Sequence, residues 1–320
     1  MISLTSCHHK ELCLHHPHTV TLKVEFDWRD APEADPRGMC VFFYPEDGGE
    51  PRRYDFSNRK GGEIHLNVGR YRVLCYNNDT EGVLFKGKST FDAHEAYTRE
   101  GNVLESIFGN GYSVPQKVKD HTEERVVICP DMMWGCNAID VDVTDYGLSY
   151  ICSKHEECIE NKEYVITLYP AELTCIYTYE IRNVKNLKHA SQMCASLSGM
   201  SGGINFSSQE LHSECVTLPV ESSFDKVSNI YGKFITFGHH ENNAGPHRML
   251  LYVWMDDGQK YLFGSESERF DVTNQIHDAP NKRRVHIIID GLDLPQPIEN
   301  GHGFSPSVDD WDEVYEDIFM

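Results

Sequence analysis

The sequence predicts a mainly β protein made of two tandem β-sandwich domains, the second of which carries one short helix. Short segments of alternating apolar and polar residues, separated by turns of Gly, Pro, Asn and Asp, are typical of sandwiches. The chain has 320 residues, which suits two cores of roughly 130–150 residues better than one. We therefore expect a first domain over residues 19–150 and a second over residues 151–295.

Six strands are expected in the first domain. Residues 19–28 alternate strictly, with Val20, Leu22 and Val24 on one face, which is the period of a half-buried strand. A loop over residues 30–38 with two prolines follows. The remaining strands of this domain are expected at residues 40–44, 64–68, 70–76, 125–129 and 139–144.

The second domain is expected to resume after a charged, weakly patterned stretch at residues 146–161. Its strands are predicted at residues 163–169, 172–182, 215–220, 232–238, 248–255, 260–263 and 285–290. One segment differs, because Leu187, Ala190, Cys194 and Leu197 recur every three or four residues, which is the spacing of one helix face. Gly199 would then cap the C-terminus of this short helix.

The chain ends in an acidic tail. Residues 290–320 contain nine Asp or Glu and no Lys or Arg. Residues 296–320 are expected to form a linker and a terminal strand, in which Val314 and Ile318 share one face. The strand either serves a partner or folds back on its own domain.

Composition excludes several classes of function. A net charge of −21 argues against nucleic-acid binding, because phosphates need a basic surface. No apolar run approaches the roughly 18–20 residues of a membrane-spanning helix. No combination of residues indicates an enzyme or a bound cofactor.

The N-terminal segment, residues 1–18, predicts a lipid-anchored tether. Leu4-Thr5-Ser6-Cys7 fits a lipobox, in which the cysteine receives a lipid. Only six residues precede Cys7, fewer than a signal h-region needs. Either the start lies further upstream, or the motif is accidental. Seven of residues 7–18 are Cys or His, but a terminus lacks the fixed elements of a structural metal site.

The eleven cysteines leave two interpretations open. With Cys7 lipidated, ten remain, an even number that could pair in an exported protein. Several of them alternate with apolar residues and would equally suit buried thiols.

Other candidate sites have simpler structural explanations. Ser201 lies in a G-x-S-x-G motif, but the predicted order of helix before serine reverses that of a hydrolase elbow. Asp140, Asp142 and Asp145 resemble a calcium loop but fit the acidic solvent face of a strand better. Trp134 and Trp311 are expected outside the cores and are the better candidates for surface contacts.

Six short motifs stand out along the chain, at residues 7–13 (CHHKELC), 26–28 (FDW), 76–80 (YNNDT), 197–203 (LSGMSGG), 234–238 (FITFG) and 308–311 (VDDW). In combination they resemble the fimbrillin-like lipoproteins of Bacteroidales, a family of unknown function related to the anchor and accessory subunits of type V pili. The resemblance covers essentially the whole chain.

This resemblance implies two transthyretin-like Greek-key sandwiches, lipidation at Cys7 and exposure on the outer membrane surface. It implies a non-enzymatic fimbrial subunit that assembles with other fimbrial subunits by strand addition. Trp311, Val314 and Ile318 would belong to the strand that meets the partner. A host or polysaccharide ligand is a further candidate partner. Two alternatives stay open, a glycan-binding surface lipoprotein and, less favoured, a serine hydrolase using Ser201.

Overall fold

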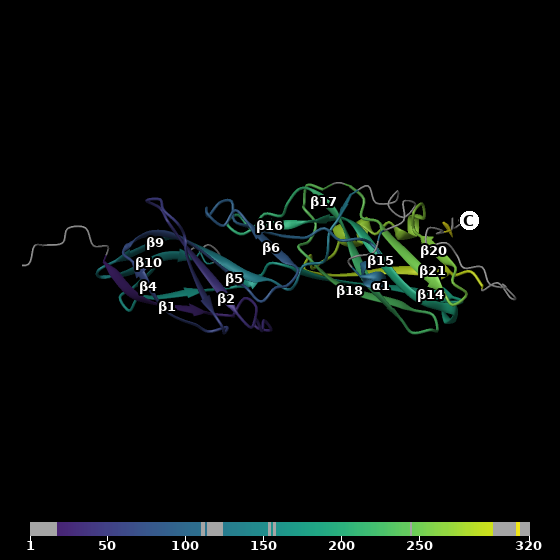
Figure 1. Ribbon diagram of the computed structural model, residues 1–320, viewed down its shortest axis with the longest axis horizontal. Helices are drawn as coiled ribbons and strands as arrows, with labels where there is room; N and C mark the ends of the chain where they lie inside the picture. Colours follow the sequence, from purple (N-terminus) through teal and green to yellow (C-terminus); the bar gives the residue numbers. More distant parts are fainter. Residues whose placement is uncertain are drawn as a thin grey trace, which may run out of the picture.

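The computed structural model describes residues 18–109, 113, 124–152, 155, 158–243, 245–296 and 312–313. The chain is mainly β, as predicted, and its strands form two bodies that lie end to end along the long axis (Figure 1). We call them the first and the second sandwich. Within the described residues no helix is long and apolar enough to cross a membrane.

The first sandwich consists of a seven-stranded and a three-stranded sheet. The larger sheet runs in the order β11 (Cys158–Asn161), β10 (Gly147–Cys152), β9 (Trp134–Thr144), β5 (Gly69–Asn77), β2 (Met39–Pro45) and β3 (Arg52–Phe56), with β13 (Ala171–Glu172) paired to β9. The smaller sheet runs in the order β12 (Val165–Leu168), β1 (Thr19–Phe26) and β4 (Gly61–Asn67). Two strands that follow residue 150 thus belong to the first sandwich, since β12 pairs with β1 and β11 pairs with β10.

Alternation along β1 buries Leu22 and Val24 against the larger sheet, while their neighbours face solvent. Strand β2 is different, because nearly all of its residues are buried. Val41 and Phe43 enter the core between the two sheets, whereas Phe42 packs on the opposite face. The larger sheet is therefore covered on both faces, which gives β2 a continuous apolar sequence.

The second sandwich is built from one nine-stranded sheet that folds over its own core. Its order is β21 (Arg284–Asp293), β14 (Cys175–Lys185), β18 (Ile230–Thr236), β17 (Cys215–Phe224), β15 (Ala190–Ser201), β19 (Met249–Met255), β20 (Lys260–Phe263) and β22 (Asp312–Glu313), with β8 (Arg125–Val126) paired to β17. Strand β17 pairs with β15 along its first part and with β18 at its end, so it connects the two layers.

The helix expected at residues 187–197 is wrong. Leu187–His189 is a single 3₁₀ turn, and β15 begins at Ala190. β15 lies between β17 and β19 and is buried on both faces, so its apolar residues do not alternate. Gly199 is not a helix cap but lies at a break in register with φ +80°, and a Cβ there would lie 2.6 Å from His247 Nδ1. The short helices lie elsewhere, at α1 (Glu105–Phe108) and α3 (Thr273–His277), with a second 3₁₀ turn at η2 (Glu268–Phe270).

Between β5 and β9 the chain leaves the larger sheet of the first sandwich, and its described residues pack both on the outer face of that sheet and against the second sandwich. We call this segment, residues 78–133, the excursion. Its strands β6 (Val83–Lys86) and β7 (Glu95–Thr98) form a small sheet with β16 (Gly203–Asn205), and its strand β8 joins β17. Figure 1 shows β6 and β16 between the two sandwiches.

An aromatic cluster fills the junction under the excursion. Tyr76 of β5 stacks on Phe206, with ring centroids 4.5 Å apart. His94 of the excursion is fully buried beside them, and its ring nitrogens lie 2.6 Å from the Tyr44 hydroxyl and 3.1 Å from the Tyr76 hydroxyl. A neutral imidazole has one donor and one acceptor, so both bonds are made without charge.

Burial lowers the pKa of His94 from 6.5 to about 4. Between these two pH values the His94 side chain is therefore protonated in the unfolded chain and neutral in the folded chain. The free energy of unfolding is thus highest above pH 6.5 and decreases as the pH falls toward 4. We expect thermal denaturation to show a falling midpoint over this window, with a shallower fall in His94→Gln. The exposed His65→Gln is the matched control, and an unchanged pH slope in His94→Gln would contradict the assignment.

Candidate functional site

The two ends of the nine-stranded sheet differ in how their backbone groups are satisfied. At one end, the tail residues of β22 pair in parallel with β20, in the register Tyr261 to Asp312 and Leu262 to Glu313. Edge strands carry rows of unpaired N–H and C=O groups that accept a further strand. The β20 edge thus holds a strand that is separated from it by about 50 residues of chain.

Side chains close the other end of the sheet, at β21. The Gln275 carboxamide of α3 donates to the Ile288 carbonyl at 2.9 Å and accepts from the Ile288 N–H at 2.8 Å. Arg269 donates to the Gly291 carbonyl at 3.0 Å. Gln275 therefore bonds the backbone of β21 as a neighbouring strand would, and hinders the addition of a further strand there. Neither residue carries a signal in the sequence, because their role depends on where α3 and η2 pack.

Most of the residues that are predicted to anchor the chain or to meet a partner lie outside the part of the chain that the structure describes. Cys7, Trp311, Val314 and Ile318 lie outside the described residues. Trp134 is the first residue of β9, where it is half-buried and pairs with Glu172 of β13. Its expected place outside the strands is thus corrected, and its role in surface contacts stays a prediction.

Ser201 has the surroundings of a structural hydroxyl. It is 2% exposed, and its Oγ lies 2.9 Å from the Gly203 carbonyl and 3.0 Å from the His212 carbonyl. The hydroxyl proton therefore has backbone acceptors, and Oγ does not stand at an exposed turn as a nucleophile elbow requires. Asp140 and Asp142 lie in β9, as the strand interpretation predicts.

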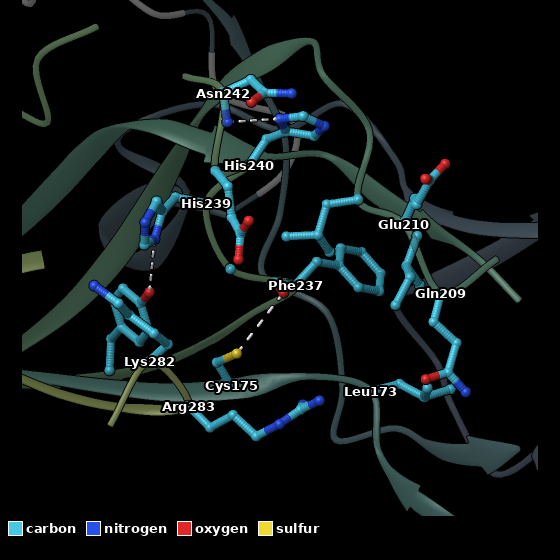
Figure 2. A pocket seen from close by; sticks show the side chains of 15 residues that line it. Leu173, Cys175, Gln209, Glu210, Phe237, His239, His240, Asn242, Lys282 and Arg283 are labelled. Carbon is cyan, nitrogen blue, oxygen red and sulfur yellow. Dashed lines mark hydrogen bonds between the residues drawn. The ribbon is translucent and has the colours of Figure 1, made fainter. Parts of the chain in front are cut away.

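A cavity of about 480 Å³ opens where the second sandwich meets the loops that precede β17 and follow β18 (Figure 2). Its apolar wall includes Leu173, Leu211 and Phe237. Glu210 and Arg283 are among its charged lining residues, so acidic and basic groups both face the opening.

Three histidines lie together beside this cavity. The His247 Nδ1–H donates to the Ser198 carbonyl at 3.1 Å, which leaves its Nε2 as the acceptor for His277 Nε2–H at 3.0 Å. The ring of His239, which lines the cavity, stacks on His277 with centroids 5.1 Å apart. Burial lowers the pKa of His239 to about 4 and also lowers the pKa of His247. No group of three or more His, Cys, Asp or Glu in the described ranges could hold a metal ion.

The closed β21 edge can be opened by one substitution. We expect Gln275→Ala to lower the free energy of unfolding by about 1–3 kcal/mol, because both Ile288 backbone groups lose their partner. The open edge should also cause concentration-dependent self-association, measured by analytical ultracentrifugation. Asn274→Ala, on the exposed side of the same helix, is the control. Unchanged stability and a monomer at high concentration would show that Gln275 does not protect the edge.

Comparison with known proteins gives the following relatives. A family model described as "Domain of unknown function (DUF5119)" matches residues 6–221. A protein from Bacteroides ovatus named "Putative fimbrium anchoring subunit Fim4B" is 26% identical over 178 residues, which are 52% of this chain and 49% of that protein. The match thus spans about half the length of this curated relative.

A solved structure shares the fold, and a second shows a weaker likeness. The crystal structure of a "putative adhesin" from Bacteroides ovatus has a TM-score of 0.59 at 20% identity and covers 92% of this chain and 100% of that one. The fimbrial anchor protein Mfa2 from Porphyromonas gingivalis has a TM-score of 0.46 at 13% identity, with 84% and 90% covered. The relationship to fimbrillin-like proteins expected from the sequence motifs is confirmed. Because the family model matches more than half of its residues, the chain belongs to the DUF5119 family.

Proposed function

We propose that this protein is a non-enzymatic, surface-exposed subunit of a fimbria that acts as its anchor or as an accessory component in adhesion. The observation that carries the proposal is the pairing of residues 312–313 with the β20 edge. The relative named a fimbrium anchoring subunit supports the same role. Fimbrial subunits would be its partners.

Strand exchange at the β20 edge is the proposed means of assembly. In the free subunit the chain's own tail occupies this edge at residues Tyr261 and Leu262. In the fimbria the tail, which contains Trp311, Val314 and Ile318, would leave and pair with another subunit, or a strand of another subunit would take its place. Backbone hydrogen bonds give such contacts their affinity, and alternate side chains set their register.

The closed β21 edge leaves β20 as the better end of this sheet for strand addition.

The proposal predicts that the tail binds its edge in trans. We expect a chain that lacks residues 308–320 to stay folded, with a thermal midpoint close to that of the full chain. A fluorescent peptide of residues 308–320 should bind this shortened chain saturably in an anisotropy titration. It should bind the full chain far more weakly, because the attached tail competes at high effective concentration.

The control peptide carries Val314→Asp and Ile318→Asp, which place charge on one face of the expected strand. It should bind the shortened chain weakly. Equal binding of the unaltered peptide to both chains would argue against occupation of the edge by the tail. Unfolding of the second sandwich in the shortened chain would make the tail structural and end the exchange proposal.

We further propose that a lipid on Cys7 anchors the protein in the outer membrane. The lipobox at residues 4–7 supports this, and a net charge of −21 disfavours attachment through anionic headgroups. We expect the native gene product to partition into the outer membrane and Cys7→Ala to be released or unprocessed. Cys13→Ala, in the same segment, is the control. Identical soluble behaviour of wild type and Cys7→Ala would remove the lipid anchor.

A further inference from the structure

Two cysteines in the core of the first sandwich face one another. Cys75 of β5 and Cys136 of β9 are directly opposite in the antiparallel register, and their sulfur atoms lie 3.3 Å apart. Both side chains point into the core between the two sheets, where they are 1% and 6% exposed. We infer that Cys75 and Cys136 form a disulfide bond when the chain folds in an oxidising compartment.

The strand register already provides the distances that a disulfide needs. Opposed residues of an antiparallel pair have Cα atoms about 4.5–5.5 Å apart. Disulfides join cysteines whose Cα atoms are about 4.4–6.8 Å apart. Small side-chain rotations therefore bring the Cys75 and Cys136 sulfur atoms into bonding distance without moving the strands.

The other buried cysteines have different surroundings. Cys75 and Cys136 are therefore the two that we expect to be joined. Their thiols lie against backbone carbonyls, as for Cys40 at 3.4 Å from the Tyr76 carbonyl and Cys194 at 3.4 Å from the Val103 carbonyl. Cys152 lies next to Cys136, but its register partner is Ala138, two residues further along β9. Cys152 is thus diagonal to Cys136, whereas Cys75 is directly across the ladder.

The bond forms by thiol–disulfide exchange with a disulfide oxidant, either an oxidoreductase or glutathione disulfide. The thiolate of one cysteine attacks the oxidant and releases one reduced thiol. The second thiolate then displaces the other, so the two cysteines lose two protons and two electrons and the oxidant becomes two thiols. Burial raises the pKa of the folded Cys136 thiol well above its usual range. Exchange therefore takes place before the core closes.

The position of the bond gives it a role in the architecture. Cys75 and Cys136 lie just before and just after the excursion, which carries β6, β7 and β8 to the second sandwich. A disulfide here closes the excursion into a covalent loop at its base. If the chain is the fimbrial subunit proposed above, this bond would keep β5 and β9 together when the fimbria is pulled.

The test refolds the full chain from denaturant with glutathione disulfide or with dithiothreitol, followed by peptide mapping without reduction. Trypsin leaves Cys129, Cys136 and Cys152 in one peptide, because no Lys or Arg lies within residues 126–153. A second cleavage before Asp131, Asp140 and Asp145 separates them. We expect a peptide linked through Cys75 and Cys136 and, after denaturation, two fewer titratable thiols than the reduced chain.

Stability provides the second readout. The oxidised chain should unfold roughly 5–15 °C above the reduced chain. This difference should vanish in the double variant Cys75→Ala, Cys136→Ala and persist in Cys40→Ala, another fully buried cysteine of the same sheet. The peptide map of the unaltered chain decides the outcome if the double variant does not fold.

A map that shows only free thiols at Cys75 and Cys136, or a link from Cys136 to Cys152, would overturn the inference. The same map on protein exported to a bacterial periplasm tests the bond in an oxidising compartment. Neither experiment requires a fimbrial partner or a lipid, so failure of the bond and failure of the proposed function are distinguishable.

Discussion

The architecture depends on the place where the chain leaves the first sandwich and returns to it. The buried Asn77 side chain holds both sides of this passage, since its amide donates to the Met132 carbonyl at 3.1 Å and its oxygen accepts from the Trp134 N–H at 2.8 Å. The Asp131 carboxylate accepts two further hydrogen bonds, from the backbone N–H groups of Glu81 and Gly82. These contacts set the direction of the excursion, and with it the small sheet and the aromatic junction.

The second sandwich is asymmetric in a way that suits a subunit with one point of assembly. Its β21 edge is bonded by the side chains of Gln275 and Arg269, while its β20 edge is bonded by backbone from the tail. A side chain on a packed helix stays with the fold, whereas the exchange proposed above would release the strand at the β20 edge. The two ends of the sheet would then differ in whether their cover is permanent or replaceable.

The sequence was most informative where one face of a strand meets water. Residues 19–28 show the alternation that predicts a strand, because β1 exposes one side. β15 was mistaken for a helix because it is buried on both sides and has no such pattern. The short strand β16 has no local periodicity that predicts it, because its pairing with β7, which is distant in the sequence, stabilises it. The roles of Gln275 and of the Cys75–Cys136 contact likewise depend on packing and register, which a single sequence does not display.

The excursion also limits how such a protein can be recombined with its relatives. Strand β8 lies in the sequence between strands of the first sandwich but pairs with β17 of the second. The same segment supplies Val103 and Leu104, which pack on β15 and β19. If the first sandwich alone were replaced by that of a relative, the second sandwich would lose β8, Val103 and Leu104. New variants of the whole protein should therefore arise by drift within both halves together more readily than by shuffling one of them.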